Sequence, residues 1–376
     1  MTLKKSSVAK ITVAALLACL LCSCAKTEHL SDISIVEGMS VNGGADGFEV
    51  TAQTLNLAKS GNAAEGFSGN VTMNISGVGE NISRAIDNAA EGLSKQLYFG
   101  QNRIVIFGNG IDENKRRECL DYFIRSNNSQ PDVALCLAQG NPADVLNNQE
   151  HDALVPAQAL SKMLKNGQEN GSAAYVTASE LANLYLDETS DFYLPVVELE
   201  GENTYSSKTA VYDGTRLAAV LDKQQTLGFL IMKNKVDGGI LTVDDERLGK
   251  TSFEIVSSRA KTKAALVNGV PEFTADIKLK LIVNEIENGA DISVSDSDIT
   301  RLENLAQKEL KGYCRSAFEV CTQNGSDALR IGRHIARRSN SQYRQIISDW
   351  KAMLPTSVLK ITVSCECSKI NDNAKI

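Results

Sequence analysis

Cysteine chemistry gives this sequence its most specific signal, at Cys24. The residues Leu21-Cys22-Ser23-Cys24 follow the lipobox pattern of an apolar residue, two small residues and a cysteine. Cleavage before this cysteine makes it the new N-terminus, where its sulfur is acylated, so Cys24 is the predicted lipid attachment site. Two alternatives are an ordinary secretory signal that ends near cysteines, and cleavage before Cys19, which would leave apolar leader residues on the mature chain.

The first 23 residues have the composition of an export signal. Three lysines and no acid precede eleven apolar or small residues, from Ile11 to Leu21. Because a helix rises about 1.5 Å per residue, this run is too short to cross a hydrocarbon core of roughly 30 Å. Residues 1–23 are therefore predicted to be a lipoprotein signal peptide, and lipid at Cys24 is predicted to hold the mature chain on a membrane.

The cysteines beyond Cys24 are predicted to be buried free thiols. Cys314 and Cys321 lie about 10 Å apart along a predicted helix, too far for a disulfide within one helix. Cys365 and Cys367 continue the alternation of a predicted strand, on its buried face. These four thiols could form a zinc site, but no CxxC spacing supports one, so no metal is predicted.

The residue patterns do not point to catalysis. The three histidines, His29, His151 and His334, lack a credible neighbouring nucleophile or a second histidine. The segment "IVIFGNGIDE" (104–113) has two glycines of a dinucleotide loop, but Glu113 stands at the third position, where a pyrophosphate would lie. A plain strand–turn–helix is predicted there. The chain is predicted not to be an enzyme and to bind no cofactor.

One basic segment contrasts with the acidic chain. The sequence "SDALRIGRHIARRSN" (326–340) is predicted to be a helix, with its basic side chains at helical spacing. One interpretation is a solvated helix face, and the other is a contact with anionic lipid headgroups or an acidic partner. The residues of this possible contact surface are Arg330, Arg333, His334, Arg337 and Arg338.

The overall charge argues against nucleic acid as a partner. The 376 residues carry a formal net charge of −7, and removal of the three lysines of the signal would shift this charge to −10. A phosphate-binding protein needs a basic footprint, so no nucleic-acid partner is predicted. Hydrophobic residues make up 43% of the chain, which is enough for a buried core.

The hydrophobic periodicity predicts strands that alternate with helices, and hence an α+β or mixed α/β fold with mixed sheets and packed helices. Residues 82–97 have the periodicity of one helix. Asp213-Gly214 and Asn268-Gly269 are hairpin turn signals. Ser295 or Ser297 is the expected N-cap of a long helix.

The chain is long enough for more than one domain. The polar segment "ELEGENTYSSK" (198–208) is interpreted as a boundary. Three domains are predicted after the signal peptide: an N-terminal mixed α/β domain over residues 24–203, a small β-rich domain over 204–270 and an α+β domain over 271–376.

Four segments of the chain, taken in this order, carry a resemblance. They are "LSDISIVEGMSVN" (30–42), the block from "KQLYFGQNRIVIF" to "NPADVL" (95–146), the block from "TAVYDGTRLAAVL" to "GGILTV" (209–243) and "NGSDALRIGRHIARRSNSQYRQIISDWKAML" (324–354), around Trp350. With them the chain resembles the C-subunit lipoproteins of spore germinant receptors, the Ger(x)C family. Leu329-Arg330 departs from the family, where Leu-Gly is usual, and Gly100-Gln101 replaces a frequent Ser-His.

The resemblance implies a partner set and a location. It implies three domains, a lipid anchor on the outer face of the spore inner membrane, and assembly with a membrane-embedded A subunit and a transporter-like B subunit. It also implies that the complex supports germination in response to small nutrients. A solute-binding lipoprotein of a transporter is the alternative, which would need two similar lobes around a cleft often lined by aromatic residues. A lipid-anchored enzyme is a third.

Overall fold

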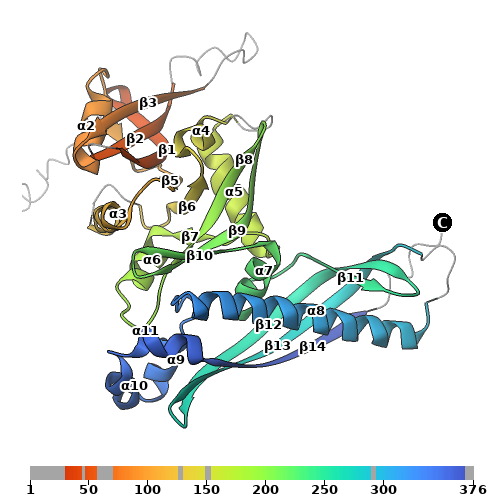
Figure 1. The fold of residues 1–376 in the computed structure, drawn as a ribbon. Coiled ribbons are helices and arrows are strands. Elements are labelled where there is room, and N and C mark those ends of the chain that lie inside the picture. The colour runs from red at the N-terminus through yellow and green to blue at the C-terminus, as the bar shows by residue number, and fades with distance from the viewer. Residues whose placement is uncertain are drawn as a thin grey trace, which may run out of the picture.

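The computed structural model describes residues 30–44, 47–56, 71–125, 130–148, 154–288 and 294–368. These residues form two sheets (Figure 1). A ten-stranded sheet with helices on both faces makes the larger part, and a four-stranded sheet with one long helix projects from it as an arm. The predicted mixture of α and β structure is confirmed. No helix in the described ranges is long and apolar enough to cross a membrane.

The larger sheet has a parallel centre and antiparallel flanks. Its order is β10-β9-β8-β6-β5-β1-β2-β3, with β4 beside β1 and β7 beside β6, and β1, β5, β6 and β8 run parallel. Its strands are β1 (Ile33–Gly44), β2 (Gly47–Leu55), β3 (Thr72–Gly79), β4 (Gln96–Tyr98), β5 (Ile104–Gly108), β6 (Ala134–Gln139), β7 (Val176–Thr177), β8 (Tyr193–Glu200), β9 (Asn203–Asp213) and β10 (Arg216–Leu221).

Alternating side chains of the central strands enter two different cores. On β5, Ile104 and Ile106 belong to the core beneath α4 and α5, whereas Val105 and Phe107 belong to the core beneath α3 and α6. The predicted strand–turn–helix after residue 104 is confirmed as β5 followed by α3. The helices here are α2 (Ile82–Ala90), α3 (Glu113–Arg125), α4 (Pro142–Asn147), α5 (Pro156–Glu169) and α6 (Ala178–Tyr185).

The arm is a four-stranded sheet, in the order β11-β12-β13-β14, and α8 lies along it (Figure 1). Asn268 and Gly269 both have positive φ, 51° and 81°, as the predicted hairpin turn between β12 and β13 requires. The helix α7 joins the two sheets. The elements here are α7 (Lys223–Met232), β11 (Ile240–Asp245), β12 (Gly249–Val267), β13 (Val270–Ile286), α8 (Asp296–Gln323) and β14 (Val358–Ser368).

One sequence-based prediction, the length of the helix after residue 82, is wrong, and another, the division into three domains, stays a prediction. The helix predicted over 82–97 ends at Ala90, because residues 96–98 pair with β1 as β4 and this pairing overrides the helical periodicity. Hydrogen-bonded hairpins cross both proposed domain boundaries, β8–β9 at 203/204 and β12–β13 at 270/271. The three-domain division stays a prediction.

Most of the cysteines that were predicted to be buried are buried in the structure. Cys314, Cys321 and Cys365 are buried, and Cys367 is partly exposed, and all four are free thiols. Burial raises the pKa of Cys314 and of Cys321 to about 12, so both are unreactive at neutral pH.

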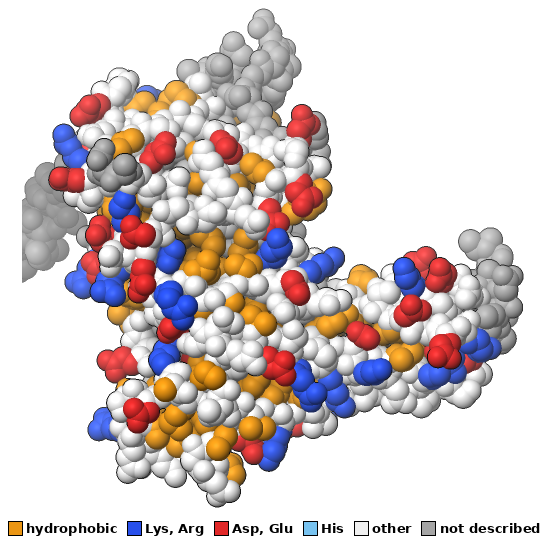
Figure 2. All heavy atoms as spheres, in the orientation of Figure 1, with side chains coloured by type: hydrophobic (Ala, Val, Ile, Leu, Met, Phe, Trp, Pro, Cys, Tyr) orange, Lys and Arg blue, Asp and Glu red, His pale blue; other side chains and the backbone are white. Residues whose placement is uncertain are grey.

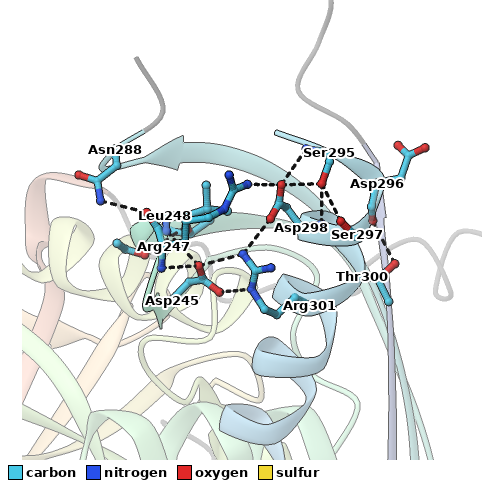
Figure 3. Close-up of polar contacts among 12 residues, drawn as sticks. Asp245, Arg247, Leu248, Asn288, Ser295, Asp296, Ser297, Asp298, Thr300 and Arg301 are labelled. Carbon is cyan, nitrogen blue, oxygen red and sulfur yellow. Dashed lines mark hydrogen bonds and ion pairs between the residues drawn. The ribbon is translucent and has the colours of Figure 1, made fainter. Parts of the chain in front are cut away.

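A polar network ties the start of α8 to the turn between β11 and β12 (Figure 3). Ser295, one of the two predicted candidates, is the N-cap, and its N–H and hydroxyl donate to the buried Asp298 carboxylate at 2.9 and 2.6 Å. Arg301 donates to Asp245 at 2.6 Å and to Asp298 at 2.8 Å, and Arg247 also pairs with Asp298. The hydrogen bond from Arg301 holds the pKa of Asp245 at about 2, so the network is ionised at neutral pH and fixes the direction of α8.

The helices α7 and α8 approach most closely at Gly228. A Cβ added there would lie 2.5 Å from the carbonyl carbon of Tyr313 and 2.6 Å from the backbone nitrogen of Cys314. Gly228 is therefore required for packing, and the buried apolar side chains after it complete the α7 core contact.

Gly228→Ala is expected to lower the free energy of unfolding by about 2 to 3 kcal/mol, because α7 must move away from the α8 backbone. Gly312→Ala is the matched control on α8, since an added Cβ there meets open space. Helix propensity should make that control more stable by about 0.5 to 1 kcal/mol. Urea unfolding followed by circular dichroism measures both, and equal effects would contradict the close approach.

Candidate functional site

The loop between α8 and α9 (Ile331–Arg338) is organised by the buried carboxylate of Asp327. This carboxylate accepts the N–H of Ile331 at 2.6 Å, the N–H of Gly332 at 2.8 Å and the indole N–H of Trp350 at 3.2 Å. Burial raises the pKa of Asp327 to about 7, and the backbone N–H groups oppose this rise. One side chain thus starts α9 and holds the helix that carries Trp350, α11 (Trp350–Met353).

A second buried carboxylate joins this loop to the larger sheet. Asp191 lies just before β8 and accepts the backbone N–H of Asp327 at 2.6 Å and that of Gly214 at 2.9 Å. Lys351 donates to Asp191 at 2.5 Å and to Asp213 at 2.7 Å. The C-terminal helices are therefore fixed to the β9–β10 hairpin through a charged network.

A third carboxylate, Asp187, holds two of the predicted surface arginines. Arg330 donates to it at 3.1 Å, and Arg333 forms a second ion pair with the same oxygen. Burial opposes ionisation of Asp187, but hydrogen bonds from Thr189 and the two arginines outweigh it and lower its pKa to about 2. The two arginines are therefore paired with the protein body.

A pocket of about 410 Å³ lies beside these ion pairs. Its walls come from α6, the end of α7, β12 and the residues around the start of α9. We call it the basic pocket, because its charged lining residues are Lys233, Lys235, Arg330 and a single acid, Glu180, with His334 beside them.

Lys233 is the most constrained cation of the basic pocket. Its ammonium donates to the carbonyl of Ala328 at 2.8 Å and lies 4.6 Å from the ring centre of Tyr193 and 5.3 Å from that of Phe229. Desolvation, with repulsion from Lys235, lowers the pKa of Lys233 to about 7. The folded protein therefore holds this amine near its titration point at neutral pH.

The other polar groups of the basic pocket have unequal partners. Glu180 accepts from Lys235 at 2.6 Å and from the hydroxyl of Tyr193 at 3.0 Å, so its charge is compensated. His334 lies 3.4 Å from the hydroxyl of Thr262, and desolvation lowers its pKa. The Nε of Arg330 is buried and has no hydrogen-bond partner in the described part of the chain.

Arg330 also has an unusual backbone. Its φ of 64° and ψ of 36° lie in the left-handed region, which favours glycine. This conformation costs about 1 to 2 kcal/mol for a residue with a side chain. Glycine would adopt this backbone without strain, whereas the arginine of this chain is strained.

The structure divides the predicted basic surface. The helix predicted over 326–340 starts only at Ile331, because the Asp327 side chain caps it there, so Arg330 lies before the helix. Arg330, Arg333 and His334 face the protein body, and Arg337 and Arg338 are exposed in the last turn of α9. The contact role of this surface stays a prediction.

Other residues of the site had no signal in the sequence. Lys233, Glu180 and Asp187 come from segments far from residue 330 along the chain, and only the fold brings them together. Cys24 lies outside the described residues. In the described ranges, no group of three or more His, Cys, Asp or Glu side chains is arranged to hold a metal ion.

Comparison with known families matches the chain on both sides of the β8–β9 hairpin. A model of the spore germination protein N-terminal domain matches residues 26–199, and a model of the spore germination B3/GerAC-like C-terminal domain matches residues 207–370. The chain belongs to the Ger(x)C family of spore germination proteins. This is a family of germinant receptor C subunits, which are non-catalytic receptor components.

Two curated relatives of this Ger(x)C chain match over nearly its whole length. Spore germination protein B3 of Bacillus subtilis is 23% identical and covers 92% of the chain and 93% of the relative. Spore germination protein GerQC of Bacillus cereus is 21% identical and covers 87% of the chain and 90% of the relative. The crystal structure of the GerBC protein shares the fold, with a TM-score of 0.58 and 18% identity over 89% of this chain and 97% of the GerBC chain.

Asp327→Ala is expected to lower the free energy of unfolding by about 3 kcal/mol, because it leaves three buried N–H donors without an acceptor. The matched control is Asp349→Ala, since Asp349 is exposed and makes no capping hydrogen bond. The control should change stability by less than about 0.5 kcal/mol. Denaturant unfolding with tryptophan fluorescence measures both, and an Asp327 effect as small as the control would contradict the central role of this carboxylate.

Proposed function

We propose that this chain is the lipid-anchored, non-catalytic C subunit of a spore germinant receptor. In this proposal it supports nutrient-triggered germination together with membrane-embedded A and B subunits. The observation that carries the proposal is the match of both family models, in order, over residues 26–370. The solute-binding lipoprotein of a transporter is not favoured by these comparisons, because both curated relatives are spore germination proteins.

The proposed position is the outer face of the spore inner membrane, with acyl chains on Cys24. The lipobox at Leu21–Cys24 supports this proposal. A single acyl chain gives only marginal membrane binding, so stable anchoring needs two chains or a second contact. The short segment after Cys24 would keep the folded body close to the membrane and to the A and B subunits.

The exposed part of the basic surface is the proposed second contact. Arg337 and Arg338 are exposed, whereas Arg330 and Arg333 already pair with Asp187. Figure 2 shows acidic and basic side chains interspersed over the visible face, without a field of one sign. A local basic contact of this kind would select an acidic surface on a partner or anionic headgroups, rather than nucleic acid.

Cys24→Ala is expected to move the protein from the membrane fraction to the soluble fraction, because the acyl anchor is lost. Cys22→Ala is the matched control, since Cys22 is predicted to leave with the signal peptide, and it should stay in the membrane fraction. Cell fractionation with intact-mass measurement of the N-terminus gives the result. A processed, unlipidated Cys24→Ala chain that remains on the membrane would contradict the lipid anchor.

Arg337→Glu with Arg338→Glu is expected to reduce crosslinking to the A and B subunits or binding to anionic vesicles by roughly tenfold, because two favourable charge contacts become repulsive. The control reverses Arg84 and Arg117, which are exposed on the larger sheet's helices and change the net charge equally. Crosslinking in spore membranes and vesicle flotation measure the two arms. If both pairs have the same effect, Arg337 and Arg338 belong to a solvated face.

A further inference from the structure

We propose that the basic pocket binds a small organic carboxylate, with its carboxylate between Lys233 and Arg330. The pocket is a concave site of about 410 Å³, and Lys233 and Arg330 both line it. The proposed receptor role does not assign this site, and the proposal does not depend on that role.

The charges around the basic pocket leave an excess of positive charge. Glu180 already compensates Lys235 through a 2.6 Å ion pair. Asp187 is shared by Arg330 and Arg333, so one carboxylate faces two guanidinium groups. Lys233 has no ion-pair partner among the described residues, since its ammonium contacts a carbonyl and two aromatic rings. An anion is the ligand class that would balance these cations.

Unused donors point in the same direction. The guanidinium of Arg330 has five N–H donors, and its hydrogen bond to Asp187 uses one of them. The ammonium of Lys233 has three N–H donors, and one of them is used by Ala328. A carboxylate has two acceptor oxygens and could receive N–H groups from both side chains.

A smaller, apolar part of the pocket wall favours an organic ligand over an inorganic ion. Leu184, Met232 and Leu329 are nearly fully buried side chains that line the same pocket. A short aliphatic group on the ligand would lie against them, whereas inorganic phosphate has no apolar part to bury. The basic pocket therefore fits a carboxylate that carries a small aliphatic group.

The backbone of Arg330 is an independent observation. The arginine stands at a φ of 64°, where glycine is the unstrained residue. Local strain of this kind persists at sites where the side chain has a use. The ion pair between Arg330 and Asp187 does not by itself explain the strained backbone, because Arg333 already pairs with the same carboxylate oxygen.

The first experiment uses the full chain purified in detergent, titrated with isovalerate by calorimetry at pH 6.5. Saturable binding with a dissociation constant on the order of 1 mM is expected for a ligand of this size. The uncharged analogue 3-methylbutanol should bind at least roughly tenfold more weakly, and inorganic phosphate should also bind more weakly. Equal binding of the alcohol, tighter binding of phosphate, or no saturable isovalerate binding would overturn the proposal.

Arg330→Gly is the decisive variant, because the backbone accepts glycine there and Arg333 still pairs with Asp187. The variant should fold normally and bind isovalerate roughly tenfold more weakly. Lys233→Met should weaken binding as well, and Arg337→Gln, an exposed change on the same helix, should not. Unchanged affinity in Arg330→Gly, or an equal loss in Arg337→Gln, would overturn the proposal.

A pH series supplies a second readout. Burial lowers the pKa of Lys233 to about 7, so this amine loses its charge above neutral pH. Isovalerate should therefore bind at least roughly tenfold more weakly at pH 9 than at pH 7. Affinity that does not change over this range would contradict a contact with Lys233. The titratable and charged groups that face Lys233 from the packed elements are Glu180, Tyr193, Lys235, Cys321, Asp327, Arg330 and His334.

The binding assay contains no receptor partner, so its failure would leave the receptor proposal untouched.

Discussion

The carboxylate of Asp327 is the contact on which the C-terminal part of the molecule depends. It receives three N–H donors that belong to the start of α9 and to Trp350, and its own backbone N–H is received by Asp191 of the larger sheet. A buried polar group of this kind is stable only when its hydrogen bonds are made. These hydrogen bonds fix where α9 begins and how it and Trp350 are placed against the larger sheet.

The basic pocket is a product of that junction. Its walls belong to the larger sheet's α6, to the connecting α7, to β12 of the arm and to the start of α9, so none of the individual elements contains it. The close approach of α7 to α8 at Gly228 places the arm relative to these walls.

Much of the local structure could be predicted from the sequence. Ser295 is a strong N-cap by residue type, Asn268-Gly269 satisfies a turn that needs two positive φ angles, and the alternation before Cys365 marks a strand. These signals are local, so tertiary contacts did not alter them. The helix over 82–97 was predicted too long, because pairing of residues 96–98 with β1 is a tertiary contact that periodicity does not report.

The candidate site was predictable only in part, for the same physical reason. Helical spacing drew attention to Arg330 and Arg333. It placed Arg330 inside a helix, whereas α9 begins only at Ile331, whose N–H donates to Asp327. Lys233 and Asp187 lie 97 and 143 residues before Arg330, and a linear pattern does not reveal such proximity. Burial, which sets the charge state of Lys233, is likewise a property of the assembled fold.

The left-handed backbone at Arg330 has an evolutionary consequence. Arginine and glycine codons can differ by one base, so a single mutation would exchange the charged side chain for a residue that this backbone prefers. Replacement of Arg330 by glycine would cost little free energy of unfolding, because the exchange relieves backbone strain. Gain or loss of the positive charge is thus one mutational step that leaves the architecture intact.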